Sequence, residues 1–375
     1  MSTESLFQPL KLGRYTLGHR VVMAPLTRMR ATPGTNAPNA LNAKYYGQRA
    51  SDGGLIVCEA TPVIASGTAA PNVPGVWSDE QIAGWKLVTD AIHAKGGIAF
   101  LQLWHGGRIS HSSLQPDGGV PQSASDVPPS SGMVLGADFK PHPFETPRPL
   151  RSDEIPALVA AYGQAAENAV AAGFDGIEIH GANGYLLEQF LQSRTNKRTD
   201  AYGGSIENRA RLMLEATKAA ADAIGADRVG IRLSPYGQAN DSGEDDPMPL
   251  YSYVIGELNK LGLAYLHLIE PRASGAGQRE VDHKDAPSGC EIVRPLWKGT
   301  LITAGNFKSD TAAATVAKGH ADAIAFGRYF IANPDLPELI RHEAAFRPYD
   351  RSTFYGGDAR GYTDYEPLSA TAAAE

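Results

Sequence analysis

Three side chains able to hold and protonate a polarised molecule stand close together in the sequence, at His180, Asn183 and Tyr185. If the chain makes a single turn there, His180 and Asn183 share one face of it. Two neutral hydrogen-bond donors on one face can hold a single oxygen, such as a carbonyl oxygen that gains negative charge as an enolate forms. The phenol of Tyr185 is a weak acid, with an ordinary pKa of about 10, and it could deliver a proton to carbon.

The same residues also have structural interpretations. A histidine inside a barrel often only satisfies neighbouring buried polar groups, and Tyr185 could pack its ring in the core while its hydroxyl stays hydrated. A metal site at His180 is a third alternative. Asparagine is a poor zinc ligand, however, and no carboxylate stands at ligand spacing, so we expect no metal.

Two further polar pairs, Gly305-Asn306 and Gly327-Arg328, each follow a short apolar run. Glycine lets the backbone approach a phosphate closely, and an arginine can pair with it through two hydrogen bonds. We therefore predict a phosphate site here, rather than two ordinary turns and a surface arginine. Arg232 lies inside an apolar run and needs an anionic partner when buried. A structural ion pair and an anionic reduced cofactor ring both remain open as that partner.

The elements that must position these residues are short apolar runs that alternate with longer stretches of helical period. Several runs are continuous and rich in Val, Ile and Leu, which is typical of strands buried on both faces of a parallel sheet. The eight predicted strands are Val21 to Ala24, Leu55 to Glu59, Ile98 to Leu103, Gly176 to His180, Val229 to Leu233, Tyr265 to Ile269, Leu301 to Ala304 and Ala323 to Phe326.

Helices are predicted between these strands. Ser78 and Gln81 have the spacing of a capping box at the start of one helix, and the Lys95-Gly96-Gly97 stretch ends it. Acidic residues near Ser152 favour the start of a second helix, which Gly173 ends. Weaker helical segments are predicted over roughly 40–50, 207–224, 250–261, 309–318 and 334–344.

Eight strands with crossover helices predict an α/β fold, a closed (β/α)8 TIM barrel, with residues 1–375 as a single domain. An open doubly wound sheet is the main alternative, but Gly275-Ala276-Gly277 lacks the third glycine of a dinucleotide-binding turn. The long connections 106–150, 234–249 and 270–288 all follow strands, so they should emerge at the C-terminal face, where such barrels carry their chemistry.

Three other segments have predicted roles in this fold. Phe7 to Leu17 is expected to form a hairpin that plugs the opposite end of the barrel. Residues 106–150 are expected to form an excursion or lid after the third strand. Residues 366–375 are expected to be a frayed tail.

Composition excludes several classes of protein. The formal net charge of the 375 residues is -7, with no concentrated basic face, so we expect no nucleic-acid partner. Two cysteines make no disulfide framework and favour a reducing compartment. The start has no signal-peptide pattern, and no run reaches the ~20 apolar residues of a membrane span. We expect a cytoplasmic protein without a membrane partner, as a monomer or small homo-oligomer.

Five motifs, in their usual order, resemble those of the old yellow enzyme family. They are Met23-Ala24-Pro25-Leu26-Thr27-Arg28, the run from Leu101 to Arg108, the run from His180 to Phe190, Asn208-Arg209-Ala210-Arg211 and Phe354-Tyr355-Gly356-Gly357. The resemblance runs from about Leu6 to Tyr365, and it is closest to bacterial ene-reductases of the N-ethylmaleimide and xenobiotic reductase type.

The resemblance implies FMN, held noncovalently at the barrel mouth. It assigns the flavin ring and ribityl chain to Pro25, Leu26, Thr27, Ala60, Gln102 and Arg232, with His180 and Asn183 also at the cofactor. It assigns the phosphate to Gly305, Asn306, Gly327 and Arg328. It assigns the substrate pocket to Thr27, Trp104, His180, Asn183, Tyr185 and Tyr355.

The implied reaction passes hydride from NADPH or NADH through flavin N5 to the β-carbon of an activated alkene. The substrates would be α,β-unsaturated carbonyls, maleimides or nitro compounds, and Tyr185 would protonate the α-carbon. Some relatives have a second histidine where this chain has Asn183, and others have cysteine in place of Thr27. Many have a tyrosine after the second strand, where this chain has Ser66-Gly67-Thr68-Ala69, which puts the upper wall of the pocket in doubt.

Three other functions remain as alternatives. A 2,4-dienoyl-CoA reductase would need Fe–S cysteines, and Cys58 and Cys290 are too few for a cluster. A cofactor-free phosphate-binding barrel would need a catalytic lysine or carboxylate, for which Glu59 and Glu270 are the candidates. A noncatalytic binding barrel would be colourless. Arg272 and Arg279 could meet the 2′-phosphate of NADPH, although solvated loop charges are the simpler interpretation.

Overall fold

Eight parallel strands close into a barrel in the computed structural model, which describes residues 2–271, 273 and 287–367. Their order around the barrel is β10-β11-β12-β13-β14-β3-β4-β5. The strands are β3 (Val21–Met23), β4 (Leu55–Pro62), β5 (Ile98–Trp104), β10 (Gly176–Gly181), β11 (Val229–Leu233), β12 (Tyr265–Ile269), β13 (Leu301–Ala304) and β14 (Ala323–Phe326). All eight predicted strands are confirmed, and with them the (β/α)8 fold.

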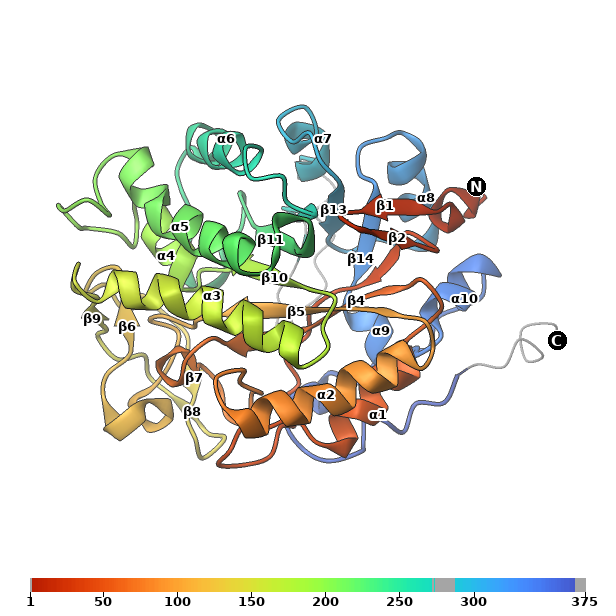
Figure 1. Ribbon diagram of the computed structural model, residues 1–375, viewed down its shortest axis with the longest axis horizontal. Helices are drawn as coiled ribbons and strands as arrows, with labels where there is room; N and C mark the ends of the chain where they lie inside the picture. The colour runs from red at the N-terminus through yellow and green to blue at the C-terminus, as the bar shows by residue number, and fades with distance from the viewer. Residues whose placement is uncertain (1, 272, 274–286, 368–375) are drawn as a thin grey trace.

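The helices surround the barrel, as Figure 1 shows for α2, α3 and α5 across its near side. Seven helices lie where helical segments were predicted: α1 (Ala40–Arg49), α2 (Asp79–His93), α3 (Ile155–Ala171), α5 (Ile206–Ile224), α6 (Pro247–Leu258), α8 (Ser309–Ala317) and α10 (Leu336–Arg341). Three short helices were not predicted: α4 (Leu186–Leu191), α7 (Gly289–Val293) and α9 (Arg328–Ala332). They are too short to show a helical period in the sequence.

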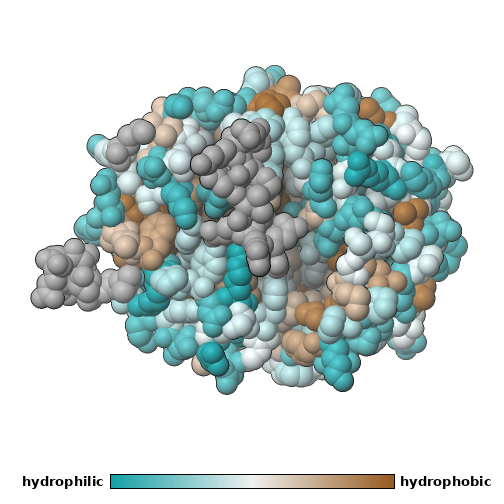
Figure 2. Space-filling model, turned by 180° about the vertical axis from the view of Figure 1, so that it is seen from behind, coloured by the Kyte–Doolittle hydropathy of each residue, from teal (hydrophilic) through white to brown (hydrophobic). Residues whose placement is uncertain are grey.

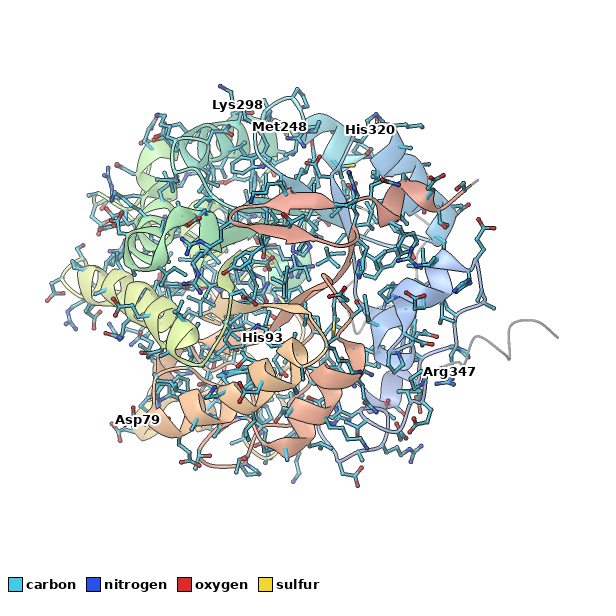
Figure 3. The ribbon with its side chains drawn as sticks, turned by 45° about the vertical axis from the view of Figure 1, so that its right-hand side comes forward. Asp79, His93, Met248, Lys298, His320 and Arg347 are labelled. Atoms are coloured by element: carbon cyan, nitrogen blue, oxygen red, sulfur yellow. The ribbon has the colours of Figure 1, made fainter. Side chains whose placement is uncertain are left out.

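The predicted capping box starts α2. The Ser78 side chain accepts a hydrogen bond from the Gln81 amide, and the Gln81 side chain accepts one from the Ser78 amide. The other end of the helix is tied to the strand layer, because His93 Nε2 lies 2.8 Å from Asp175 Oδ2, just before β10. Figure 3 labels Asp79 and His93 at the two ends of this helix.

The predicted hairpin is formed by β1 (Leu10–Leu12) and β2 (Tyr15–Leu17), drawn in red in Figure 1. Leu12 and Leu17 are fully buried and share one apolar cluster with strand side chains such as Phe100. The aromatic ring of Tyr15 meets that of Phe100 edge to face at 6.1 Å. The hairpin therefore plugs the N-terminal end of the barrel, as predicted.

The connection 106–150 forms an excursion with short strands of its own. Within it, β6 (Gln122–Ser123) pairs with β9 (Arg148–Pro149), and β7 (Val134–Leu135) pairs with β8 (Pro141–His142). Most of the predicted loop 270–288, with Gly275-Ala276-Gly277, Arg272 and Arg279, lies outside the described residues, as does the tail from 368.

Two buried arginines that follow β3 hold the segment near the C-terminus. Arg28 donates to the carbonyl oxygens of Phe354 and Gly361 at 2.8 and 2.9 Å. Arg30 donates to the Asp358 carbonyl at 3.0 Å, and its guanidinium lies 4.5 Å from the centre of the Tyr362 ring. These contacts fasten the segment that carries Tyr355 against the barrel.

Hydrophilic residues predominate on the face of the molecule shown in Figure 2, with smaller hydrophobic groups among them. Within the described part of the chain, none of the helices combines the length and the apolar character needed to span a membrane.

The hairpin turn provides a test of the plug. Gly13 has a φ of +55°, and a Cβ there would lie 1.9 Å from the Asp227 carbonyl oxygen. Gly34 has a φ of +84° with nothing within 4 Å of such a Cβ, so it is a matched control. We expect Gly34→Ala to lower the free energy of unfolding by about 1–2 kcal/mol, the cost of a left-handed alanine. Gly13→Ala should lower it further, because the clash adds to the strain. Equal losses in chemical denaturation would contradict this packing.

Candidate active site

Arg232 lies in β11 between two histidines on the neighbouring strands. Its Cα is paired in register with that of His180 on β10 and with that of His267 on β12. The Arg232 Nε atom is buried and has no hydrogen-bond partner among the described residues. Burial lowers the pKa of Arg232, although the charge of Glu178 opposes this effect. The barrel thus holds a cation whose hydrogen bonding is incomplete.

His180 is a neutral hydrogen-bond donor. Burial lowers the pKa of the imidazole to about 3, and the charge of Arg232 adds to the effect. The Ala182 amide donates to His180 Nδ1 at 3.3 Å, so this nitrogen is the acceptor. The proton of the neutral ring must then lie on Nε2, which can donate it to a bound oxygen.

Tyr185 lies beside His180 at the C-terminal end of the barrel. Its ring meets those of His180 and Trp104 edge to face, with centroids 5.0 and 4.9 Å apart. Burial raises the pKa of the phenol to about 12, and the nearby Tyr355 also raises it. A hydrogen bond with the Asn240 side chain acts in the opposite direction. Tyr185 therefore keeps its proton at neutral pH.

The segment between His180 and Tyr185 is not the single helical turn that we considered from the sequence. His180 belongs to β10, and Asn183 and Gly184 take left-handed φ values of 60° and 73°. The physical reason is crowding and anchoring of the backbone. A Cβ on Gly184 would lie 2.6 Å from the Ala239 carbonyl oxygen, and the Asn183 carbonyl accepts a hydrogen bond from Asn240 Nδ2 at 2.8 Å.

Hydrogen bonds to the carboxyl group of Glu188 stabilise this turn. Its carboxyl group accepts hydrogen bonds from the Gly184 amide at 2.5 Å, from Ser234 Oγ at 2.8 Å and from the Tyr251 hydroxyl at 2.6 Å. Ser234 Oγ in turn accepts a hydrogen bond from the Asn183 amide at 2.9 Å. Burial raises the pKa of Glu188 to about 7, while the three donors lower it. The turn that carries Asn183 and Tyr185 is therefore fixed by buried contacts.

Apart from Arg232 on β11, the residues predicted for the flavin ring lie in or just after three strands. Pro25, Leu26 and Thr27 follow β3, Ala60 lies in β4, and Gln102 lies in β5. Ala60 shares an apolar cluster with Trp104, against which Tyr185 packs. Gln102 is buried, and its Nε2 donates to Glu178 at 2.7 Å.

The residues predicted for the phosphate lie on two neighbouring strand ends. Gly305 and Asn306 follow β13, and Gly327 and Arg328 follow β14, which pairs with β13. A Cβ on Gly327 would lie 3.3 Å from the Leu26 side chain, so this end lies close to the segment after β3. Asn306 has a φ of 51°, and its buried Oδ1 has no hydrogen-bond partner among the described residues.

The comparisons with known proteins agree with this geometry. A model of the NADH:flavin oxidoreductase / NADH oxidase family matches residues 5–346. The chain is 45% identical to 12-oxophytodienoate reductase 2 of Arabidopsis thaliana, over 98% of this chain and 96% of that protein. It is 46% identical to flavin oxidoreductase hxnT of Emericella nidulans, over 96% of this chain and 97% of that protein.

A solved structure of morphinone reductase superposes with a TM-score of 0.91 at 48% identity, covering 98% of this chain and 97% of that one. Another structure of morphinone reductase, in complex with tetrahydroNAD, superposes with a TM-score of 0.90. This chain belongs to the old yellow enzyme family of NADH:flavin oxidoreductases. It is therefore an enzyme, a flavoprotein oxidoreductase that uses FMN and a nicotinamide cofactor.

The side chains present fit FMN. Arg232 Nε, Asn306 Oδ1 and Trp104 Nε1 are buried polar atoms that find no hydrogen-bond partner in the described part of the chain. Such atoms are rare unless a ligand or water completes them. When bound, the flavin could complete them, with a cation for its ring from Arg232. Among the described residues, no three His, Cys, Asp or Glu side chains cluster closely enough to hold a metal.

Several residues that shape the site were missed from the sequence. Glu178 and His267 are polar residues inside apolar strands, and this irregularity was a signal that could have found them. Glu188 and Ser234 meet only in the folded chain, and so do Asn240 and Tyr185. Nothing in their spacing predicts these contacts.

The protonation state of His180 gives a direct test of the geometry. We expect imidazole ¹⁵N NMR to show a neutral ring with its proton on Nε2 from pH 8 down to pH 5, because its pKa is lowered to about 3. His180→Gln removes the signal and so assigns it. A ring that titrates near its ordinary pKa of about 6.5, or that carries its proton on Nδ1, would contradict the structure.

Proposed function

We propose that this enzyme is an ene-reductase that reduces the C=C bond of α,β-unsaturated carbonyls, maleimides or nitro compounds with hydride from NADPH or NADH. The observation that carries this proposal is the pairing of two neutral groups at the barrel mouth. A histidine with its proton on Nε2 lies in edge-to-face contact with a tyrosine of raised pKa, one strand away from the partly buried Arg232.

His180 and Asn183 would act as the pair that polarises the substrate. The Nε2 proton of His180 and the side-chain amide of Asn183 can each donate to one carbonyl or nitro oxygen. Withdrawal of electron density toward that oxygen makes the β-carbon electrophilic. Because His180 has a pKa of about 3, it stays a neutral donor throughout and does not take up a competing proton.

Tyr185 would supply the proton to the α-carbon. Burial keeps its hydroxyl protonated, with a pKa of about 12, so the acid is present at any physiological pH. The hydrogen bond with the Asn240 side chain lowers the pKa of Tyr185, which means that it favours the phenolate left after proton transfer. Asn240 also binds the Asn183 carbonyl at 2.8 Å, so one side chain positions both residues.

When bound, FMN would supply the two-electron chemistry that links the nicotinamide to the substrate. We propose that Thr27, Gln102 and Arg232 contact the ring, that Pro25, Leu26 and Ala60 line it, and that Gly305, Asn306, Gly327 and Arg328 hold the phosphate. His180 and Asn183 would also contact the cofactor. Trp104 and Tyr355 would shape the substrate pocket, with Tyr355 close enough to Tyr185 to affect its pKa.

A cofactor-free barrel would use Glu59 or Glu270 as its catalytic carboxylate, and each of them accepts hydrogen bonds from other groups of the fold. Glu59 accepts hydrogen bonds from the Arg28 amide at 3.0 Å and from the Tyr46 hydroxyl at 3.2 Å. Glu270 accepts hydrogen bonds from the backbone amides of Gly289 and Cys290 at the start of α7, at 2.7 and 3.0 Å. Both candidate carboxylates of a cofactor-free barrel are thus engaged in structural contacts.

Relatives named for reduction of 12-oxophytodienoate and morphinone support enones as the substrate class. The bacterial ene-reductase subtype, the preference for NADPH or NADH, the cytoplasmic location and a monomer or small homo-oligomer stay predictions. So do the single-domain organisation and the role of 106–150 as a lid.

The Tyr185→Phe variant tests the proposed acid. A positioned acid typically contributes about 10²–10⁴ in rate. We expect the variant to lose this factor in stopped-flow reoxidation of the reduced enzyme by an enone, while reduction of the flavin by the nicotinamide stays near the wild-type rate. Equal losses in both half-reactions would show that Tyr185 has no specific role in protonation.

The phosphate site can be tested by ligand choice. We expect Arg328→Ala to weaken binding of FMN to the apoprotein about tenfold or more, the loss of a hydrogen bond to a charged group. Binding of riboflavin, which lacks the phosphate, should be unchanged. Lys298→Ala is the control, since Lys298 is an exposed cation at the periphery in Figure 3. If Arg328→Ala weakens the binding of FMN and of riboflavin equally, Arg328 does not contact the phosphate.

A further inference from the structure

Glu178 is a fully buried carboxylate in the middle of β10, two residues before His180. It accepts three hydrogen bonds from side chains on two other strands of the barrel. Gln102 Nε2 on β5 donates to its Oε1 at 2.7 Å, and its Oε2 lies 3.0 Å from the Tyr265 hydroxyl and 2.8 Å from His267 Nδ1, both on β12. No step of the proposed reaction uses this group.

The contacts show that Glu178 is ionised. Burial raises its pKa, but His267, Arg232 and Gln102 outweigh that effect, and the pKa is lowered overall. Burial lowers the pKa of His267, while the charge of Glu178 opposes this effect. His267 Nδ1 lies 2.8 Å from the carboxylate, so the proton on Nδ1 is the one donated to Glu178. A carboxylate surrounded by donors cannot itself donate, which fixes the proton positions of its partners.

One consequence concerns the amide of Gln102. Its NH2 group must face Glu178, because only that end of the amide can donate. The Oε1 atom is then the end left to accept a hydrogen bond from a ligand. Glu178 therefore determines which way the Gln102 amide is presented.

A second consequence concerns the charge of Arg232. The negative charge of Glu178 acts on Arg232 and favours its charged form. Inside a barrel, charges interact more strongly than in water. The cation that Arg232 presents to a ligand is thus partly offset by an anion on the adjacent strand.

We propose that Glu178 is a positioning residue that orients the Gln102 amide and offsets the charge of Arg232, and that it thereby sets how strongly the site favours the reduced flavin over the oxidised one. The reduced ring carries more negative charge than the oxidised ring, so it responds more strongly to the cation. This inference rests on the proposed placement of Gln102 and Arg232 at the flavin ring.

The test is the two-electron midpoint potential of the FMN-loaded Glu178→Gln variant. The glutamine keeps the shape of the side chain, and Tyr265 and His267 can reverse their hydrogen bonds to accept its NH2 group. We expect the reduced flavin to be favoured about tenfold relative to the oxidised one, which raises the potential by about 30 mV. An unchanged potential in this variant would show that the charge of Glu178 does not set the redox preference.

Two further variants separate charge from hydrogen bonding. Tyr265→Phe removes one hydrogen-bond donor from the Glu178 carboxylate but keeps the charge of that carboxylate. The midpoint potential of this variant should therefore stay near the wild-type value. Glu178→Asp keeps the charge but withdraws the carboxylate from Gln102. It should weaken binding of oxidised FMN to the apoprotein, measured by fluorescence, with little change in the potential.

Arg232→Ala distinguishes failure of this inference from failure of the proposed site. If Arg232→Ala lowers the potential while Glu178→Gln leaves it unchanged, the site is correct and the role of Glu178 is overturned. If neither variant moves the potential, the flavin ring does not lie at Arg232, and the proposed placement itself is wrong. Should Glu178→Gln fail to fold, an unchanged FMN affinity in Glu178→Asp would still overturn the role in orienting Gln102.

Discussion

The partial burial of one arginine inside a closed barrel is the constraint on which the rest of this site depends. A guanidinium removed from water costs several kcal/mol unless anions and acceptors replace the lost hydration. Glu178 supplies part of that compensation from the next strand, and Nε of Arg232 has no hydrogen-bond partner within the residues that the structure describes. The fold therefore leaves the hydrogen bonding of Arg232 incomplete within the described part of the chain.

The same burial determines the chemistry of the neighbouring side chains. Removal from water disfavours a second positive charge, and the field of Arg232 adds to that, so His180 stays neutral. A neutral histidine can donate a hydrogen bond to an oxygen without surrendering a proton to it. Burial of the Tyr185 hydroxyl raises the pKa of this phenol to about 12, so Tyr185 keeps its proton at neutral pH. Burial thus lowers the pKa of His180 and raises that of Tyr185, so both side chains are neutral at physiological pH.

Much of the fold could be predicted from the sequence, because it depends on local patterns. Eight apolar runs gave the eight strands, and the spacing of Ser78 and Gln81 marked the start of α2. The positions of the polar strand ends then followed from the rule that parallel strands place their C-terminal ends on one face. That rule is why residues as far apart as Leu26 and Gly327 were expected together, and they do lie together.

The rest depends on contacts between distant segments, which no local pattern encodes. The turn at Asn183 could have been helical by its spacing alone. It is left-handed because Ala239 crowds Gly184 and Asn240 binds its backbone, and both come from the loop after β11. Glu178 and Glu188 were overlooked for a related reason. A buried carboxylate is recognisable only when its donors are known, and those donors come from other strands and helices.

The anchoring of the segment around Phe354 by Arg28 and Arg30 bears on how the enzyme is made. These arginines leave the ribosome early, whereas the carbonyl oxygens that they bind, up to Gly361, leave it more than 300 residues later. The two guanidinium groups must wait, solvated or with temporary acceptors, until translation has passed that point. Anchoring of the segment that carries Tyr355 is therefore tied to the synthesis of nearly the whole chain.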